Sequence, residues 1–132
     1  MELKVIPAFE VASIWPKVAD FIGSAMAYDG DGVALDDVFE ALEYGSMQLF
    51  TVGPVSDPKA AAVVSIRHDL SRARIHWCGG TGIDEWIDCV QGIKTWAANQ
   101  GLKKTRTTCR EGFVKKLHGW RKLGIVLETI NE

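Results

Sequence analysis

The chain has 132 residues, of which 47% are apolar and 24% are charged, and its formal net charge is -2. A chain of this length holds one hydrophobic core and rarely two, so we expect a single domain over residues 1–132. The apolar fraction excludes a disordered chain. No stretch approaches the roughly 20 consecutive apolar residues that a membrane-spanning helix needs, so we expect no membrane partner.

The cysteines indicate the compartment. The sequence has three, at Cys78, Cys89 and Cys109, and no two of them form a CxxC pair. This odd number predicts neither a disulfide framework nor a zinc site, so we expect no bound metal. The N-terminal segment also lacks the long apolar region of a secretory signal. We therefore expect a cytoplasmic protein.

The charges are distributed unevenly along the chain. Residues 1–57 contain ten acidic and two basic residues, whereas residues 103–122 contain eight Lys or Arg residues and one acidic residue. A positive field of this kind attracts phosphate-bearing ligands, nucleic acid or an acidic protein. The alternative is that the basic side chains only solvate the outer faces of amphipathic elements.

The first half of the sequence predicts a strand followed by two helices. Residues 2–6 alternate polar and apolar side chains and stop at Pro7, which indicates a strand. Apolar residues at helical spacing predict a helix that begins at Pro16, because proline is tolerated at the first helical position. Residues 28–32 form a turn-rich loop. A second helix is expected over residues 36–44, and Gly45 suits its C-terminal cap.

After Gly45 the hydrophobic pattern changes from a helical to a strand period. Apolar and β-branched runs separated by turn formers predict three antiparallel strands, at residues 47–52, 61–67 and 73–78. The remaining elements are expected to be a helix at 83–97 closed by Gly101, a strand at 104–109, a helix at 113–120 and a last strand at 124–130. The resulting order is β-α-α-β-β-β-α-β-α-β.

Four stretches of the sequence, together with this order of elements, resemble a known family. They are "WPKVADFIGSAM", "DDVFEALEYGSMQLFTV", "IKTWAANQGLKK" and "CREGFVKKLHGWRKLGI". Over nearly its whole length the chain resembles the GNAT superfamily, the Gcn5-related N-acetyltransferases, and most closely the small GNAT-like proteins of tailed phages. The resemblance implies an α+β fold with a mixed, mostly antiparallel sheet and helices on both faces. It also implies a phage-encoded protein, found in the host cytoplasm or in the virion.

The resemblance further implies an acetyl-CoA site at "CGGTGI", residues 78–83. In this family acetyl-CoA inserts where the fourth and fifth strands splay apart, and its pyrophosphate rests on backbone N–H groups of the loop that opens the third helix. A helix N-terminus and close-approaching glycines are physically suited to phosphate. The residues implied at the cofactor are Trp77, Cys78, Gly79, Gly80, Thr81, Gly82, Ile83, Cys109 and Arg110. One of the basic residues Lys103, Lys104 or Arg106 is expected near its adenosine phosphate.

The expected chemistry is attack of an amine on the thioester, which needs a base and donors for the oxyanion. His76 and Glu85 are the candidate bases. Many family members use a Tyr on the fourth helix as general acid; residues 113–120 contain no Tyr, and His118 is the candidate replacement. Cys109 has two interpretations, a nucleophile or a buried structural thiol, and the sequence favours the second. Arg110 either binds phosphate or fixes the helix to the sheet.

Two classes of function follow. The first is an acyl-CoA-dependent N-acetyltransferase or acetyl-CoA binder. The second is a non-catalytic, phage-encoded protein that binds a host protein or a virion component through the basic region at 103–122. Trp77 favours this second class, because it stands where the family has Gln or Arg. Nucleic-acid binding is a weaker third option, because the overall charge is acidic and no recognition motif is present.

Overall fold

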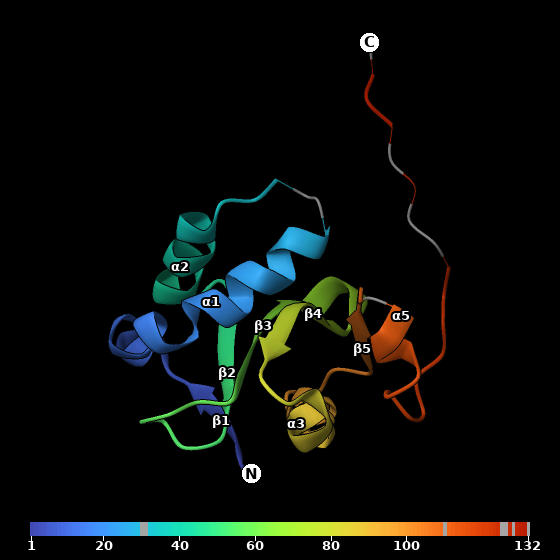
Figure 1. The fold of residues 1–132 in the computed structure, drawn as a ribbon. Helices are drawn as coiled ribbons and strands as arrows, with labels where there is room; N and C mark the ends of the chain where they lie inside the picture. The colour runs from blue at the N-terminus through green and yellow to red at the C-terminus, as the bar shows by residue number, and fades with distance from the viewer. Residues whose placement is uncertain (30–31, 110, 125–126, 128, 132) are drawn as a thin grey trace.

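The structure is a computed structural model that describes residues 1–29, 32–109, 111–124, 127 and 129–131 (Figure 1). The helices are α1 (Val11–Asp29), α2 (Leu35–Tyr44), α3 (Ile83–Val90), α4 (Gly92–Asn99) and α5 (Glu111–Val114), with 3-10 turns η1 (Ala8–Glu10) and η2 (His68–Leu70). The strands are β1 (Leu3–Ile6), β2 (Gln48–Val52), β3 (Ala60–Arg67), β4 (Arg72–Gly80) and β5 (Lys104–Thr107).

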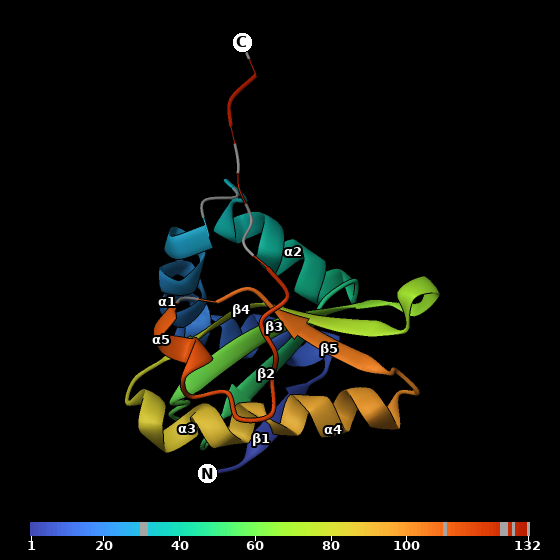
Figure 2. The same ribbon diagram turned by 90° about the vertical axis from the view of Figure 1, so that its right-hand side faces the viewer.

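The five strands found in the described chain form one sheet in the order β1-β2-β3-β4-β5. The first three neighbouring pairs are antiparallel, and β4 and β5 are parallel. Figure 2 shows α1 and α2 on one side of this sheet and α3 and α4 on the other. The predicted fold class, an α+β protein with a mixed, mostly antiparallel sheet covered on both faces, is confirmed.

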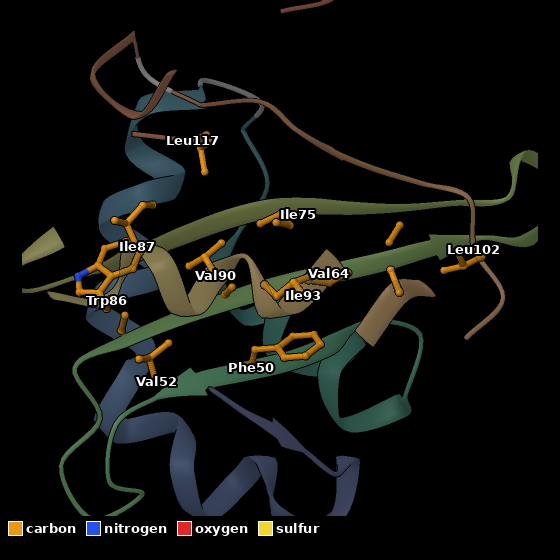
Figure 3. Close-up of a cluster of buried hydrophobic side chains, with 14 residues drawn as sticks. Phe50, Val52, Val64, Ile75, Trp86, Ile87, Val90, Ile93, Leu102 and Leu117 are labelled. Atoms are coloured by element: carbon orange, nitrogen blue, oxygen red, sulfur yellow. The ribbon is translucent and has the colours of Figure 1, made fainter. Parts of the chain in front are cut away.

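Each face of the sheet has its own buried core. On the face under α1 and α2, which we call the α1 face, helical residues pack on Leu49, Ala61, Val63 and Trp77. On the opposite α3 face, Phe50, Val64 and Ile75 meet the inner side of α3 and α4, as Figure 3 shows. Trp86 is the largest side chain buried there, with 1% of its surface exposed. The alternation of strand side chains between two apolar layers is what stabilises this arrangement.

Helix α1 begins earlier than the sequence predicts. The sequence predicts Pro16 at the first helical position, but Pro16 lies inside α1, which begins at Val11. Proline in a helix interior removes one backbone hydrogen bond. The additional turn is stabilised by burial, because Val11, Ile14 and Val18 lie at helical spacing and are at most 4% exposed.

The single helix predicted over residues 83–97 is also wrong, because the chain forms α3 and α4 with a turn at Gln91 between them. At this turn the N–H of Gln91 donates to the Asp88 carbonyl, and the N–H of Lys94 donates to the Gln91 carbonyl. These bonds span three residues rather than four, so the helix tightens locally. Gly92 also permits a close approach of β1, because a Cβ there would lie 2.9 Å from Leu3 Cδ2.

The C-terminal region differs most from expectation. The predicted helix at 113–120 is reduced to the four residues of α5 and following turns. Of the strand predicted at 124–130, Ile125, Val126 and Glu128 lie outside the described residues, and the described positions are not in a strand. Leu127 is 89% exposed. In the described chain β5 is therefore an edge strand.

No helix among the described residues combines the length and the apolar character needed to cross a membrane. Across the same residues, the His, Cys, Asp and Glu side chains form no group of three or more that could hold a metal ion.

Candidate functional site

The central feature of the site is the point where β4 and β5 separate. The two strands pair in parallel from Arg72 opposite Lys104 to Ile75 opposite Thr107. β4 then continues to Gly80, whereas β5 ends at Thr107 and the chain turns away into α5. The strands therefore leave a wedge beyond their last pair, and the sheet is open at this place.

A cavity of about 150 Å³ lies in this wedge, and we call it the β4–β5 cavity. Tyr28 of α1 lines it from one face of the sheet, and Ile87 of α3 lines it from the other. Phe113, in α5, and Trp120 close it on the remaining side. The cavity is thus lined by elements from both faces of the sheet. Its lining is mainly apolar, with a few polar groups, which is typical of small-molecule sites.

A bulge in β4 determines which side chains reach the cavity. Along β3, Val63 pairs with Trp77 but its neighbour Val64 pairs with Ile75, so His76 is an extra residue in β4. An extra residue reverses the alternation of side chains beyond it. Accordingly Ile75 belongs to the core on the α3 face and Trp77 to the core on the α1 face.

The bulged residue His76 is held by a partner that the sequence did not indicate. His76 Nε2 lies 2.6 Å from the Ser65 Oγ on β3, within hydrogen-bonding distance. The His76 ring also contacts Trp77, with ring centroids 5.3 Å apart. His76 lines the β4–β5 cavity. These contacts fix an imidazole at the cavity wall, where it is able to exchange a proton with a bound ligand.

Two cysteines also line the cavity. Burial raises the pKa of the Cys78 thiol to about 12, and the nearby Cys109 adds to the shift. Cys109 is exposed, so the expectation that it is a buried structural thiol is wrong. Cys89 lies elsewhere, and its Sγ donates to the Met1 carbonyl at 3.3 Å.

The glycine cluster is divided between a strand and a turn. Cys78, Gly79 and Gly80 are the last residues of β4, and only Thr81 and Gly82 form the connection to α3. A Cβ on Gly79 would lie 2.5 Å from the Phe21 carbonyl oxygen. On Gly80 it would lie 2.4 Å from the carbonyl oxygen of Lys59. These two glycines therefore serve close packing, whichever ligand binds.

The start of α3 has the geometry of an anion site but carries acidic side chains. Gly82 precedes the helix with φ 66°, and the N–H of Glu85 donates to its carbonyl at 2.8 Å. The Glu85 carboxyl carbon lies 3.4 Å from the point where a Gly82 Cβ would stand. Asp84 forms an ion pair with Lys116. The Glu85 carboxylate thus lies over the turn that the sequence assigned to phosphate.

The segment 111–120, which we call the roof, closes the cavity from the side of α3 and α4. Phe113, Leu117 and Trp120 line the cavity from this segment. Besides the Asp84–Lys116 pair, the Trp120 indole N–H donates to Gln91 Oε1 at 2.9 Å, and Lys94 Nζ lies 5.8 Å from the Trp120 ring centroid. The turn between α3 and α4 therefore supplies the anchor of the roof.

Several predicted site residues lie away from the cavity. Glu85 and His118 are exposed and do not line it, and Arg110 lies outside the described residues. Lys103 and Lys104 lie at the start of β5, beside Arg72, whereas Gly82 follows the opposite end of β4. The two ends are about 25 Å apart at the usual rise of a strand, so these lysines do not share a site with Gly82.

No protein-family model matches the sequence, and no curated protein matches it either. Solved structures do match its fold. An aminoglycoside acetyltransferase from an uncultured soil metagenomic sample, in complex with sisomicin, has a TM-score of 0.72 and 5% identity over 99% of this chain and 95% of that one. A ribosomal-protein-alanine N-acetyltransferase from Brucella melitensis biovar Abortus 2308 has a TM-score of 0.67 and 6% identity, over 99% and 98%.

A third structure contains a cofactor-derived ligand. The aminoglycoside acetyltransferase AAC(6')-Iy, in complex with the bisubstrate analogue CoA-S-monomethyl-acetylneamine, has a TM-score of 0.66 and 14% identity over 99% of this chain and 97% of that one. At these identities the likeness is one of fold. The chain has the fold of the GNAT acetyltransferases, and solved structures of that fold include complexes with CoA and CoA analogues.

Proposed function

We propose that this protein binds an acyl-CoA, with acetyl-CoA as the expected donor, in the β4–β5 cavity and transfers the acyl group to an amine. The observation that carries the proposal is the cavity where β4 and β5 separate, which residues from both faces of the sheet line. The thioester end of a donor that enters from one face would there meet an amine that enters from the other. Holding the two reacting groups at one place supplies the proximity that acyl transfer requires.

In this proposal His76 is the base. It is preferred over Glu85 and His118 because it alone of the three lines the cavity. Its contact with Ser65 holds the ring in one orientation, which a proton transfer requires. The pyrophosphate would lie at the start of α3, against the backbone N–H groups of Gly82 and Ile83, because the Thr81 N–H already donates to the Lys59 carbonyl at 2.9 Å. The Glu85 carboxylate competes for that position, so the proposed site binds CoA weakly.

A second function is favoured by specific departures at the site. A carboxylate lies over the phosphate turn, and Trp77, which replaces the Gln or Arg of the GNAT pattern, is a core residue with 6% exposure. These features suit a phage-encoded protein that keeps the fold without catalysis. It would act in the host cytoplasm or the virion and bind an acidic protein partner through exposed basic side chains between residues 103 and 122.

Calorimetric titration with acetyl-CoA distinguishes the acyltransferase function from the non-catalytic function. The proposed function predicts saturable binding that Thr108→Trp weakens by about tenfold or more, because Thr108 is an exposed residue of the cavity wall and an indole there would fill the cavity. Lys103→Trp is the matched control, since it adds the same side chain at the far end of β5. Absence of binding at millimolar acetyl-CoA would reject the donor site and favour the non-catalytic function.

A further inference from the structure

Two thiols face one opening in the sheet. Ile75 and Thr107 are the last pair of β4 and β5, and Cys78 and Cys109 follow them on the two diverging segments. Both cysteines line the β4–β5 cavity, and neither is in a disulfide. They are also close enough for Cys109 to influence the titration of Cys78. No part of the proposed acyl transfer requires either thiol.

The Cα separation that a disulfide requires is close to the spacing of paired strands. Bridged cysteines have Cα atoms roughly 4.4–6.8 Å apart. Paired strands lie about 4.8 Å apart, within that range. A bond between the two sulfurs therefore holds the segments after Ile75 and Thr107 at about the spacing of paired strands. Because both cysteines line the cavity, the bond also crosses the cavity.

We propose that Cys78 and Cys109 form a reversible disulfide, and that this bond closes the β4–β5 cavity by tying β4 to the segment after β5. The site is thus a redox modification site whose reaction partner is a low-molecular-weight disulfide such as oxidised glutathione. Its effect on acyl-CoA binding depends on the proposed function, whereas formation of the bond does not.

Thiol–disulfide exchange with oxidised glutathione forms the bond in two steps. The sulfur of the exposed Cys109, as thiolate, attacks one sulfur of oxidised glutathione, and a glutathione thiolate leaves. Cys78 then gives up its proton to solvent, its sulfur attacks the Cys109 sulfur of the mixed disulfide, and the second glutathione leaves. Two protein thiols are oxidised, and one glutathione disulfide is reduced to two thiols. The second step is the slow one, because burial holds the Cys78 thiol in its protonated form.

The first test is chemical. The folded protein is brought to equilibrium in buffers of oxidised and reduced glutathione, acid-quenched and digested for mass spectrometry. We expect a peptide cross-linked through Cys78 and Cys109, present in Cys89→Ser and absent from Cys78→Ser and Cys109→Ser. A Cys109–glutathione adduct that persists at equilibrium, or a bond that involves Cys89, would overturn the proposal.

The second test measures closure of the β4–β5 cavity in the absence of acetyl-CoA. Hydrogen exchange of the β5 amides at residues 104–107 should slow by about tenfold or more in the oxidised protein, because the bond fixes the end of this edge strand. Reduction should restore the original rate. A disulfide that forms without changing this exchange would contradict closure.

Acetyl-CoA titration of the reduced and the oxidised protein then tests whether the disulfide weakens donor binding. The reduced protein should bind at least about tenfold more tightly than the oxidised protein. Equal binding by both forms would reject closure of the donor site. Absence of binding by the reduced protein would reject the proposed function alone, because the cross-link and the exchange rates are read independently.

Discussion

The two cavity cysteines show how different environments arise at neighbouring positions. Cys78 lies on a central strand against the core of the α3 face, where burial disfavours the charged thiolate. Cys109 follows an edge strand and is exposed. Thiolate is the reactive form of cysteine, so reactivity should differ between these positions although both line one cavity.

Alkylation of the folded protein with iodoacetamide tests this difference. At pH 8 we expect Cys109 to react at least about tenfold faster than Cys78, as measured by peptide mass spectrometry over time. Because the pKa of Cys78 is raised to about 12, its thiolate fraction and its rate should grow about tenfold for each pH unit up to that value. Equal rates at pH 8 would mean that Cys78 is not in the buried environment described.

The Glu85 side chain opposes binding of the donor at the proposed site. Its carboxylate lies over Gly82, at the place expected for a pyrophosphate, and two like charges cannot share that position at low cost. Removing the charge should therefore favour the ligand.

We expect Glu85→Gln to tighten binding of acetyl-CoA about two- to fivefold, which is the effect of relieving one exposed charge repulsion. Asp88→Asn is the matched control, because Asp88 is an exposed acidic residue one turn further along α3. Calorimetry at low ionic strength measures both. Weaker binding by Glu85→Gln would show that the carboxylate helps to hold the ligand.

At the level of elements, the glycines at the end of β4 explain how α1 and β3 approach this strand. The Phe21 carbonyl and the Lys59 carbonyl occupy the positions that side chains on Gly79 and Gly80 would need. Backbone atoms cannot move aside as a flexible side chain can, so substitution forces a shift of α1 or β3.

Gly79→Ala and Gly80→Ala should each lower the free energy of unfolding by about 1–3 kcal/mol or more. Gly112→Ala should change it little, because nothing lies within 4 Å of a Cβ at that position. Urea denaturation followed by tryptophan fluorescence gives the three values. If Gly79→Ala or Gly80→Ala were as stable as Gly112→Ala, the close packing described at that glycine would be wrong.

The order of the elements could be predicted because local hydrophobic periods determine it. The strand runs near 47–52, 61–67 and 73–78 and the cap at Gly45 correspond to observed elements. The start of α1 could not be predicted, since tertiary burial of Val11 and Ile14 outweighs the effect of Pro16. The turn at Gln91 likewise depends on contacts with β1 and the roof, which are remote in sequence.

The candidate site could be predicted only in part for the same reason. The family resemblance implied an opening between β4 and β5 and a phosphate site in the turn before α3. The bulge at His76 reverses the side-chain alternation along β4, and no sequence pattern predicts this bulge. The contact between His76 and Ser65 follows from that bulge, and the roof contacts follow from chain segments that meet only in the folded protein.

At the scale of the whole molecule, charges of opposite sign lie on different elements around the sheet. Helix α2, which carries four acidic residues and no basic one, covers one face of the sheet (Figure 2). The roof, which lines the cavity, carries Lys115 and Lys116, and Lys116 pairs with Asp84 at the start of α3. The acidic start of α3 therefore offsets the positive charge of the roof, in agreement with the weak donor binding proposed above.

The most direct test of the proposed donor site is to locate the donor by NMR, following backbone amide shifts during titration with acetyl-CoA. We expect saturable changes at His76, Gly82 and Cys109, around the wedge and the start of α3, with little change at Lys103 and Lys104 at the far end of β5. Changes confined to the far end, or no changes at millimolar ligand, would contradict the claim that the β4–β5 cavity is the donor site.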